Sequence, residues 1–251
     1  MIRPEEPRQL TRGRHSGKSK LFCTFINETY KKPDMKAAVV LAGCGAKDGA
    51  EIHEAVMTLY AIDRNGGTYQ IFAPNVMQHH VINHITGEVM KESRNVLTEA
   101  ARIARGNIKA LTEYRAGDFD ALIFPGGFGV AKNLCTYAFD GPDCHVDRVV
   151  EEAIRSTHKA GKPIGAMCIS PVLVTKVLRD VTVTIGTDAT AAADIKALGG
   201  THENKRLGEV AVDRKNRIVT APCYMLDATL TEIARDADAV IRAIKELLGE
   251  R

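Results

Sequence analysis

The sequence contains no apolar run long enough to cross a membrane, which needs about 18 or more consecutive residues. Its first residues also lack the basic start, apolar core and small-residue cleavage site of a secretory signal peptide. Hydrophobic residues still make up 45% of the chain, which is enough to bury a sizeable core. We therefore expect a soluble protein that does not bind membranes.

A strong charge imbalance is absent from most of the chain. Basic side chains outnumber acidic ones in residues 1–34, and without this segment the formal net charge of +3 disappears. A near-neutral body gives no electrostatic reason to expect nucleic-acid binding.

Residues 1–34 lack the apolar periodicity of the remaining chain and are rich in Arg, Lys, Pro and Ser. We expect them to form an N-terminal extension, disordered or outside the core, before a single domain over residues 35–251. The expected location is the cytoplasm, or the mitochondrion if the extension is a targeting segment. Glu5 and Glu6 argue against a targeting segment, because mitochondrial transit peptides contain few acidic residues.

Metal and cofactor motifs are also missing. The six cysteines include no CxxC pair, and no Cys/His cluster has the spacing of a zinc site. His79, His80 and His84 lie close together but lack a helical ligand spacing with a supporting carboxylate. The glycines after residue 42 lack the GxGxxG spacing of a dinucleotide-binding turn. We expect reduced thiols, no structural disulfide in a chain of this size, and neither metal nor cofactor.

What the sequence does contain is a regular alternation of apolar runs and helical patterns. The expected strands are 36–42, 68–73, 119–124, 163–167, 181–185, 209–213 and 217–220. The expected helices are 51–65, 92–105, 146–160, 170–178, 190–198 and 228–248. This alternation predicts a three-layer α/β domain with a mostly parallel central sheet covered on both faces. Ligands bind beyond the carboxyl ends of the strands in such sheets.

One of these strand ends carries a cysteine. Residues 163–167 lead through small residues into Cys168, and a helix with Pro171 in its first turn follows. This pattern is typical of a nucleophile elbow, whose tight turn holds the side chain at its apex clear of the backbone. The nearby helix N-terminus favours the thiolate. The alternative is a small buried hydrophobic residue, the usual role of a free cysteine.

Two further strand ends are rich in glycine. Gly126 and Gly127 follow Pro125, and their bare backbone can approach a ligand and direct N–H groups at an oxyanion, although a plain turn would use the same residues. The loop after 36–42 holds Cys44, and the helix after that loop begins near Glu51 and Glu54. An acidic residue such as Glu51 in a first helical turn is often only a cap.

Together these segments resemble one known family. The motifs Pro-Gly-Gly-Phe-Gly at 125–129, Gly-Ala-Met-Cys-Ile-Ser-Pro at 165–171 and Glu-Ile-His-Glu at 51–54 are similar to those of the ThiJ/PfpI superfamily. More narrowly, the likeness over residues 36 to 248 is to the ElbB-like isoprenoid-biosynthesis glyoxalases. The resemblance implies a flavodoxin-like, class I glutamine amidotransferase-like fold, a homodimer and a small carbonyl substrate such as glyoxal or methylglyoxal.

The resemblance also implies site residues. It places the nucleophile at Cys168, its acidic partner at Glu54, and the oxyanion-binding amides at Gly127 and Ile169, beside Gly126. Asn133 could hydrogen-bond substrate or cap the Gly-rich turn, and Cys44 could line the pocket or pack against its neighbours. These residues together predict a glyoxalase that needs no cofactor and forms a cysteine hemithioacetal.

One departure from the superfamily pattern concerns histidine. Many members have a histidine about twenty residues after the cysteine, whereas this chain has none between Cys168 and His202. His53 is adjacent to Glu54, and neighbouring residues on a helix do not share a face. A peptidase or amidase is therefore the weakest alternative. A redox-sensing or stress-protective cysteine without robust catalysis is the stronger one.

Overall fold

The computed structural model of the protein describes residues 34–249, so the interpretation of residues 1–34 as an extension lies outside the described residues except for Asp34. Its main sheet has seven strands in the order β3-β2-β1-β4-β5-β9-β8. Neighbouring strands are parallel except β8, which runs antiparallel to β9. The strands are β1 (Lys36–Val40), β2 (Thr68–Ala73), β3 (Ile108–Ala110), β4 (Ala121–Phe124), β5 (Ile164–Met167), β8 (Ala211–Asp213) and β9 (Ile218–Ala221).

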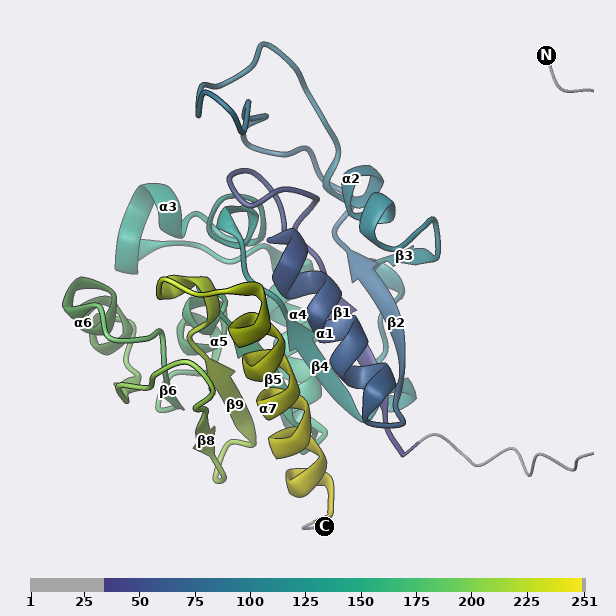
Figure 1. Cartoon of the computed structure of the whole chain (residues 1–251), viewed down its shortest axis with the longest axis vertical. Coiled ribbons are helices and arrows are strands. Elements are labelled where there is room, and N and C mark those ends of the chain that lie inside the picture. The colour runs from purple at the N-terminus through teal and green to yellow at the C-terminus, as the bar shows by residue number, and fades with distance from the viewer. Residues whose placement is uncertain (1–33, 250–251) are drawn as a thin grey trace, which may run out of the picture. The chain divides into compact units, whose positions relative to one another are not determined.

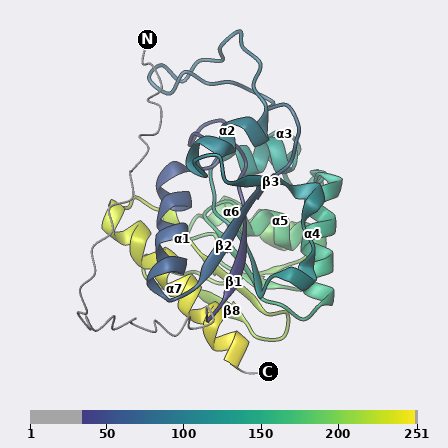
Figure 2. The ribbon, with the colours of Figure 1, turned by 90° about the vertical axis from the view of Figure 1, so that its right-hand side faces the viewer.

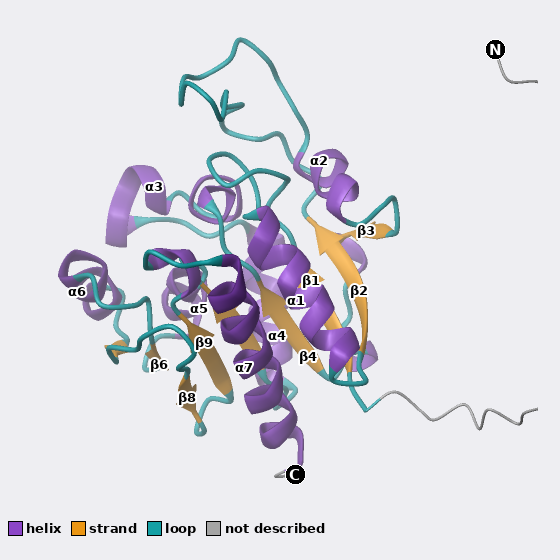
Figure 3. Ribbon diagram, in the orientation of Figure 1, coloured by secondary structure: helices purple, strands orange, loops and turns teal. Residues whose placement is uncertain are grey.

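Helices cover both faces of this sheet (Figures 1 and 2). One face carries α1 (Ile52–Arg64), α2 (Val96–Ile103) and α7 (Leu230–Gly249), and α1 packs along α7. The opposite face carries α4 (Arg148–Lys159) and α5 (Pro171–Leu178). The predicted three-layer fold with a mostly parallel sheet is confirmed, and Figure 3 shows the strands between the helical layers.

Side-chain alternation divides the interior into two cores. Along β1, Ala37 and Val39 belong to the core under α1 and α7, whereas Ala38 and Val40 belong to the core under α4 and α5. Every residue of β4, β5 and β9 is buried. Such continuous apolar runs are expected for strands covered on both sides, and they hold the strand ends in fixed register.

Several predicted elements differ from the observed ones. The expected strand 181–185 shrinks to β6 (Thr182–Val183), which pairs with β7 (Thr201–His202) in a separate two-stranded sheet. The short elements α3 (Tyr137–Asp140) and β3 have no sequence prediction that matches them, and the segment after the Gly-rich turn forms a π-helical turn over Val130–Leu134. The helix predicted at 190–198 is α6 (Ala189–Ala197). Within residues 34–249, no helix combines the length and apolarity needed to span a bilayer.

Candidate active site

Cys168 occupies a strained turn between β5 and α5. Its φ of 58° lies in the left-handed region that side chains other than glycine rarely adopt. Three hydrogen bonds hold the turn: Cys168 N donates to Ala221 O at 3.0 Å, Ser170 N to Met167 O at 2.9 Å, and Ser170 Oγ to Pro125 O at 2.8 Å. Strain that the surrounding structure maintains in this way is typical of a nucleophile elbow.

Glu54, in the first turn of α1, is the acidic partner of this thiol. Its side chain is fully buried and forms a side-chain hydrogen bond with Cys168. Glu54 Oε2 accepts a hydrogen bond from Gly126 N at 2.9 Å, and Oε1 accepts one from Tyr224 N at 3.1 Å. The ends of β4 and β9 therefore fix the carboxyl group against the cysteine.

Gly126 lies between the two groups and leaves no room for a side chain. A Cβ atom there would lie 2.3 Å from Cys168 Cβ, 2.6 Å from Glu54 Oε2 and 2.9 Å from Cys168 Sγ. Real Cβ atoms do not approach other atoms so closely. The absence of a side chain at this position is thus what allows the thiol and the carboxyl group to meet.

Two backbone amides point at the same sulfur. The N–H groups of Gly127 and Ile169 both donate hydrogen bonds to Cys168. Gly127 has a φ of 103°, which favours glycine, and a Cβ there would lie 2.3 Å from Glu51 N. Paired amides of this kind can stabilise negative charge on sulfur or on an oxygen bonded close to it.

Burial decides how the pair shares its proton. Desolvation raises the pKa of Glu54 to about 7, against the opposing hydrogen bonds from Tyr224, Cys168 and Gly126. Desolvation also raises the pKa of the Cys168 thiol, and the charge of Glu54 raises it further. Burial and the adjacent carboxylate therefore oppose the thiolate that the helix N-terminus was expected to favour. A thiolate becomes favourable when Glu54 holds the proton.

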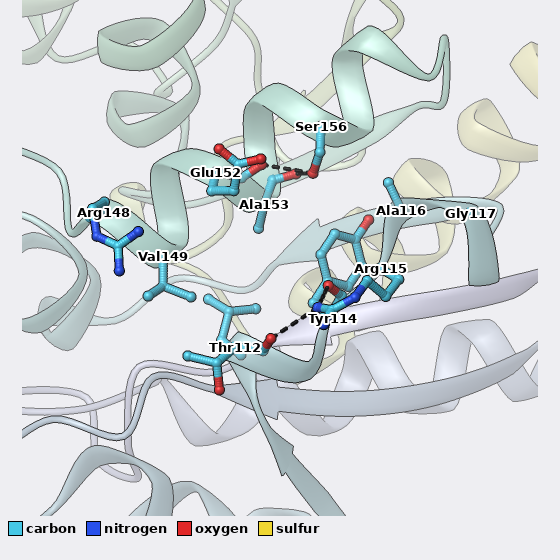
Figure 4. Close-up of a pocket in the computed structure, with 11 residues that line it drawn as sticks. Thr112, Tyr114, Arg115, Ala116, Gly117, Arg148, Val149, Glu152, Ala153 and Ser156 are labelled. Carbon is cyan, nitrogen blue, oxygen red and sulfur yellow. Dashed lines mark hydrogen bonds between the residues drawn. The ribbon is translucent and has the colours of Figure 1, made fainter.

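Cys168 opens onto a cavity of about 460 Å³ and is itself 7% exposed. The lining residues come from the loop between β1 and α1, from the ends of β4, β5 and β9, and from α3 and α6: Ala46, Glu51, Gly127, Phe128, Tyr137, Cys168, Ile169, Asp188, Thr190, Ala191, Asp194, Tyr224 and Met225. A cavity of about 560 Å³ lies elsewhere, between residues 111–117 and α4, but no cysteine or histidine lines it (Figure 4). Size alone does not mark the reactive site.

Three residues of the predicted oxyanion- and substrate-binding set do not line this cavity: Gly126, Asn133 and Cys44. Asn133 Nδ2 donates to Ala42 O at 3.0 Å and to Asp48 O at 2.9 Å, and its Oδ1 accepts from His79 N at 2.9 Å. These bonds tie the loop after β1 to the segment after β2, and none of the three partners belongs to the Gly-rich turn that Asn133 was expected to cap. Cys44 is half-buried, and burial followed by the charge of Glu99 raises the pKa of its thiol.

Sequence reasoning missed other residues of the cavity. Tyr224 follows the end of β9, next to the end of β5 that carries Cys168. Its position directly after Ala-Pro-Cys, at the end of a predicted strand, could have indicated a cavity residue. Tyr137 OH donates to Asp194 Oδ2 at 2.5 Å, across α3 and α6. Glu51 caps α1 by accepting a hydrogen bond from Glu54 N at 2.7 Å, so the expected capping role is confirmed, and it also lines the cavity.

Histidine is absent from the residues that line this cavity. His53 contacts its rim indirectly, with Nδ1 2.9 Å from Tyr224 OH. His202 Nε2 instead accepts a hydrogen bond from Ile185 N at 3.2 Å. Within residues 34–249, no group of three or more His, Cys, Asp and Glu side chains is arranged to hold a metal ion.

Curated relatives match nearly the whole chain. The human "glutamine amidotransferase-like class 1 domain-containing protein 3, mitochondrial" is 49% identical over 87% of this chain and 85% of its own length. The "ES1 protein homolog, mitochondrial" of Rattus norvegicus is 46% identical over 95% of this chain and 92% of its own. No family model matches the chain.

Solved structures also resemble this chain. An isoprenoid biosynthesis protein with an amidotransferase-like domain from Ehrlichia chaffeensis superposes with a TM-score of 0.81 at 37% identity, over 85% of this chain and 99% of that one. Glyoxalase III from Candida albicans has a TM-score of 0.54 at 15% identity, over 84% of this chain and 98% of that one. The latter likeness shows the fold alone.

Proposed function

The chain belongs to the family of the ES1 and glutamine amidotransferase-like class 1 domain-containing proteins, and on this premise we propose that it is a cofactor-independent glyoxalase. Its substrates would be small dicarbonyls such as glyoxal and methylglyoxal, and its products 2-hydroxy acids. The observation that carries the proposal is the buried Glu54 carboxyl group, hydrogen-bonded to Cys168 beside a cavity of about 460 Å³.

The first step is addition of Cys168 to the aldehyde. Glu54 accepts the thiol proton, sulfur forms a bond to the carbonyl carbon, and the proton is delivered to the carbonyl oxygen. The Gly127 and Ile169 amides donate hydrogen bonds at this sulfur, so they lie close to the oxygen that gains charge. The product of the step is a hemithioacetal.

The second step moves a proton between the two carbons. Glu54 removes the proton from the hemithioacetal carbon to give an enediolate and returns it to the neighbouring carbon. The hydroxyl proton of the hemithioacetal moves to the oxygen on that neighbouring carbon, which gives a thioester of the 2-hydroxy acid. A carboxyl group with a pKa of about 7 can both accept and donate a proton at neutral pH. Water hydrolyses the thioester, which restores the Cys168 thiol and consumes no redox equivalent.

The test is conversion of glyoxal to glycolate by the purified protein. Cys168→Ala should abolish turnover, because no covalent adduct can form. Glu54→Gln should reduce turnover by about 10² to 10⁴-fold, the contribution of a single positioned acid/base group. Glycolate production by Cys168→Ala at the parental rate would overturn the proposal.

A second candidate role is redox sensing at the same thiol. The amides of Gly127 and Ile169 could hold oxygen atoms added to Cys168, and Glu54 in its protonated form could donate to them. Intact mass after mild peroxide treatment tests this role. A selective gain of oxygen on Cys168 would favour it, and an unmodified Cys168 would exclude it.

Location and assembly also follow from the family only as proposals. The human and rat relatives carry "mitochondrial" in their names, so we favour a mitochondrial location over the cytoplasmic one. Imaging of the tagged full chain in cells would decide between them. Light scattering of the purified protein would test the expected homodimer.

A further inference from the structure

The cavity beside Cys168 is lined by negative charge. Glu51, Asp188 and Asp194 contribute three carboxylates, and its lining residues include no Lys, Arg or His. The other lining side chains are apolar, aromatic or hydroxylic. Glu51 comes from the start of α1, whereas both aspartates come from the α6 region, so the carboxylates reach the cavity from separate elements (Figure 1).

Each carboxylate is held in place through one oxygen. Glu51 Oε2 accepts from Glu54 N at 2.7 Å, Asp188 Oδ1 accepts from Ala191 N at 2.7 Å, and Asp194 Oδ2 accepts from Tyr137 OH at 2.5 Å. These contacts fix the orientation of all three groups. Among the described residues, the second oxygen of each accepts no hydrogen bond, and Glu51 Oε1 lies 4.0 Å from His53 Nδ1.

The nearest cationic groups are engaged at the rim. Lys132 Nζ donates to Lys47 O at 3.0 Å and lies 5.4 Å from the centre of the Phe128 ring. His53 Nδ1 is 2.9 Å from Tyr224 OH and 4.0 Å from Glu51 Oε1. Neither residue lines the cavity, so the carboxylates determine the sign of charge that a ligand meets.

We propose that this cavity takes a small carbonyl compound bearing a positively charged group, such as an ammonium, and excludes anionic ones. The inference rests on the proposed function for the carbonyl part of the ligand, whereas the charge preference follows from the lining alone. The ammonium would meet the free carboxylate oxygens and the faces of Phe128 and Tyr137. Carboxylate-bearing carbonyls such as 2-oxo acids would be repelled.

Charged thiol reagents test the preference without relying on turnover. The probes are 2-aminoethyl, methyl and 2-sulfonatoethyl methanethiosulfonate, which are cationic, neutral and anionic. In each reaction the Cys168 thiolate forms a disulfide with the reagent sulfur, and methanesulfinate leaves. Site-resolved mass spectrometry gives the rate at Cys168, and the cation-to-anion ratio is compared with that of free cysteine.

The expected ratio at Cys168 exceeds that of free cysteine by about tenfold or more, the scale of electrostatic focusing in a cleft of one charge sign. The triple variant Glu51→Gln/Asp188→Asn/Asp194→Asn should lower the ratio towards that of free cysteine. Asn is as good an N-cap as Asp, and Gln and Asn keep a carbonyl oxygen as acceptor, so the local folds are preserved. The matched control is Glu152→Gln. Glu152 lines the other cavity (Figure 4), so this variant should leave the cation-to-anion ratio at Cys168 unchanged.

Cys144 supplies an internal control because Arg155, Lys176 and Arg179 line its own cavity. Any labelling there should favour the anionic reagent. A cation-to-anion ratio at Cys168 equal to that of free cysteine, or unaffected by the triple variant, would overturn the inference, as would failure of all three reagents to label Cys168. Absence of glyoxal turnover with the ratio intact would count against the proposed function but not against the charge preference.

Discussion

Replacing Gly126 with alanine should separate Cys168 from Glu54 while leaving both residues unchanged. The added methyl group would lie 2.3 Å from Cys168 Cβ and 2.6 Å from Glu54 Oε2. Carbon atoms in contact are normally about 3.5–4.0 Å apart. At least one of the two side chains must therefore move by more than about 1 Å, and the turn of Cys168 is too constrained to absorb the whole shift.

The expected loss of activity follows from this displacement. A misplacement of about 1 Å in a reacting pair can reduce the rate about 10²-fold. Inserting a methyl group into a packed interior costs about 1–3 kcal/mol of unfolding free energy. Gly126→Ala should thus remain folded, with a lowered melting temperature and glyoxal turnover reduced by about two orders of magnitude.

The assay combines glycolate production with thermal unfolding followed by circular dichroism. Gly117→Ala is the matched control, because a Cβ at Gly117 would meet nothing within 4 Å. It should keep both turnover and melting temperature. Parental turnover in a folded Gly126→Ala protein would refute the reasoning, since the two groups would then have no need to touch.

Three further outcomes follow from carboxyl groups that accept backbone hydrogen bonds. Glu54 binds its proton more tightly in the folded protein (pKa about 7) than at its ordinary pKa of 4.5, so its contribution to stability falls as pH rises between these values. Chemical denaturation gives the free energy of unfolding of wild type and Glu54→Gln at pH 4 and pH 8. Between these pH values, wild type should lose roughly 3 kcal/mol relative to Glu54→Gln. The same difference between the two proteins at both pH values would contradict the raised pKa of Glu54. The Asp236 carboxylate accepts hydrogen bonds from Cys223 N at 2.8 Å and Gly208 N at 2.5 Å. Asp236→Ala should therefore lower the unfolding free energy by roughly 2–4 kcal/mol in urea titrations. An unchanged unfolding free energy would mean that these two amides find other partners. Glu51→Ala should lower the unfolding free energy by roughly 1 kcal/mol in the same titration, because the N-cap of α1 is lost. Glu51→Gln should have an unfolding free energy closer to that of wild type. Equal losses in the two variants would argue against the capping role.

The strand ends were predictable because their signals are local. A buried run followed by small residues and Cys168, or by Pro125, Gly126 and Gly127, determines a turn from its own sequence. Parallel pairing then brings those turns to one edge of the sheet. The placement of Glu54 was also accessible, although through family resemblance rather than through periodicity.

Other features depended on contacts that sequence periodicity does not encode. In the expected strand 181–185, Thr182 N donates to Asp213 Oδ2 at 2.8 Å and Thr184 N to Thr220 Oγ1 at 2.8 Å. Side chains thus satisfy backbone groups that a sheet partner would otherwise satisfy, and the strand shortens. Tyr137 and Asp194 meet only through tertiary packing of two short helices.

The direction of the Cys168 pKa shows the same limit. A helix N-terminus is visible in the sequence, and it alone favours a thiolate. Burial beside Glu54 is visible only in the fold, and it raises the pKa of the thiol.

The position of the proton-donating group, Glu54, distinguishes carbonyl chemistry from peptide hydrolysis at this site. A peptidase must protonate an amine leaving group on the far side of the scissile carbon from its nucleophile, a task that histidine performs in a Cys-His arrangement. Here the buried acid contacts the sulfur, and no histidine lines the cavity. In the proposed glyoxalase reaction, protons move only among the sulfur, the two adjacent carbons of the substrate and their oxygens, close to one carboxyl group. The arrangement of Cys168 and Glu54 therefore suits the proposed enediol pathway better than it suits amide cleavage.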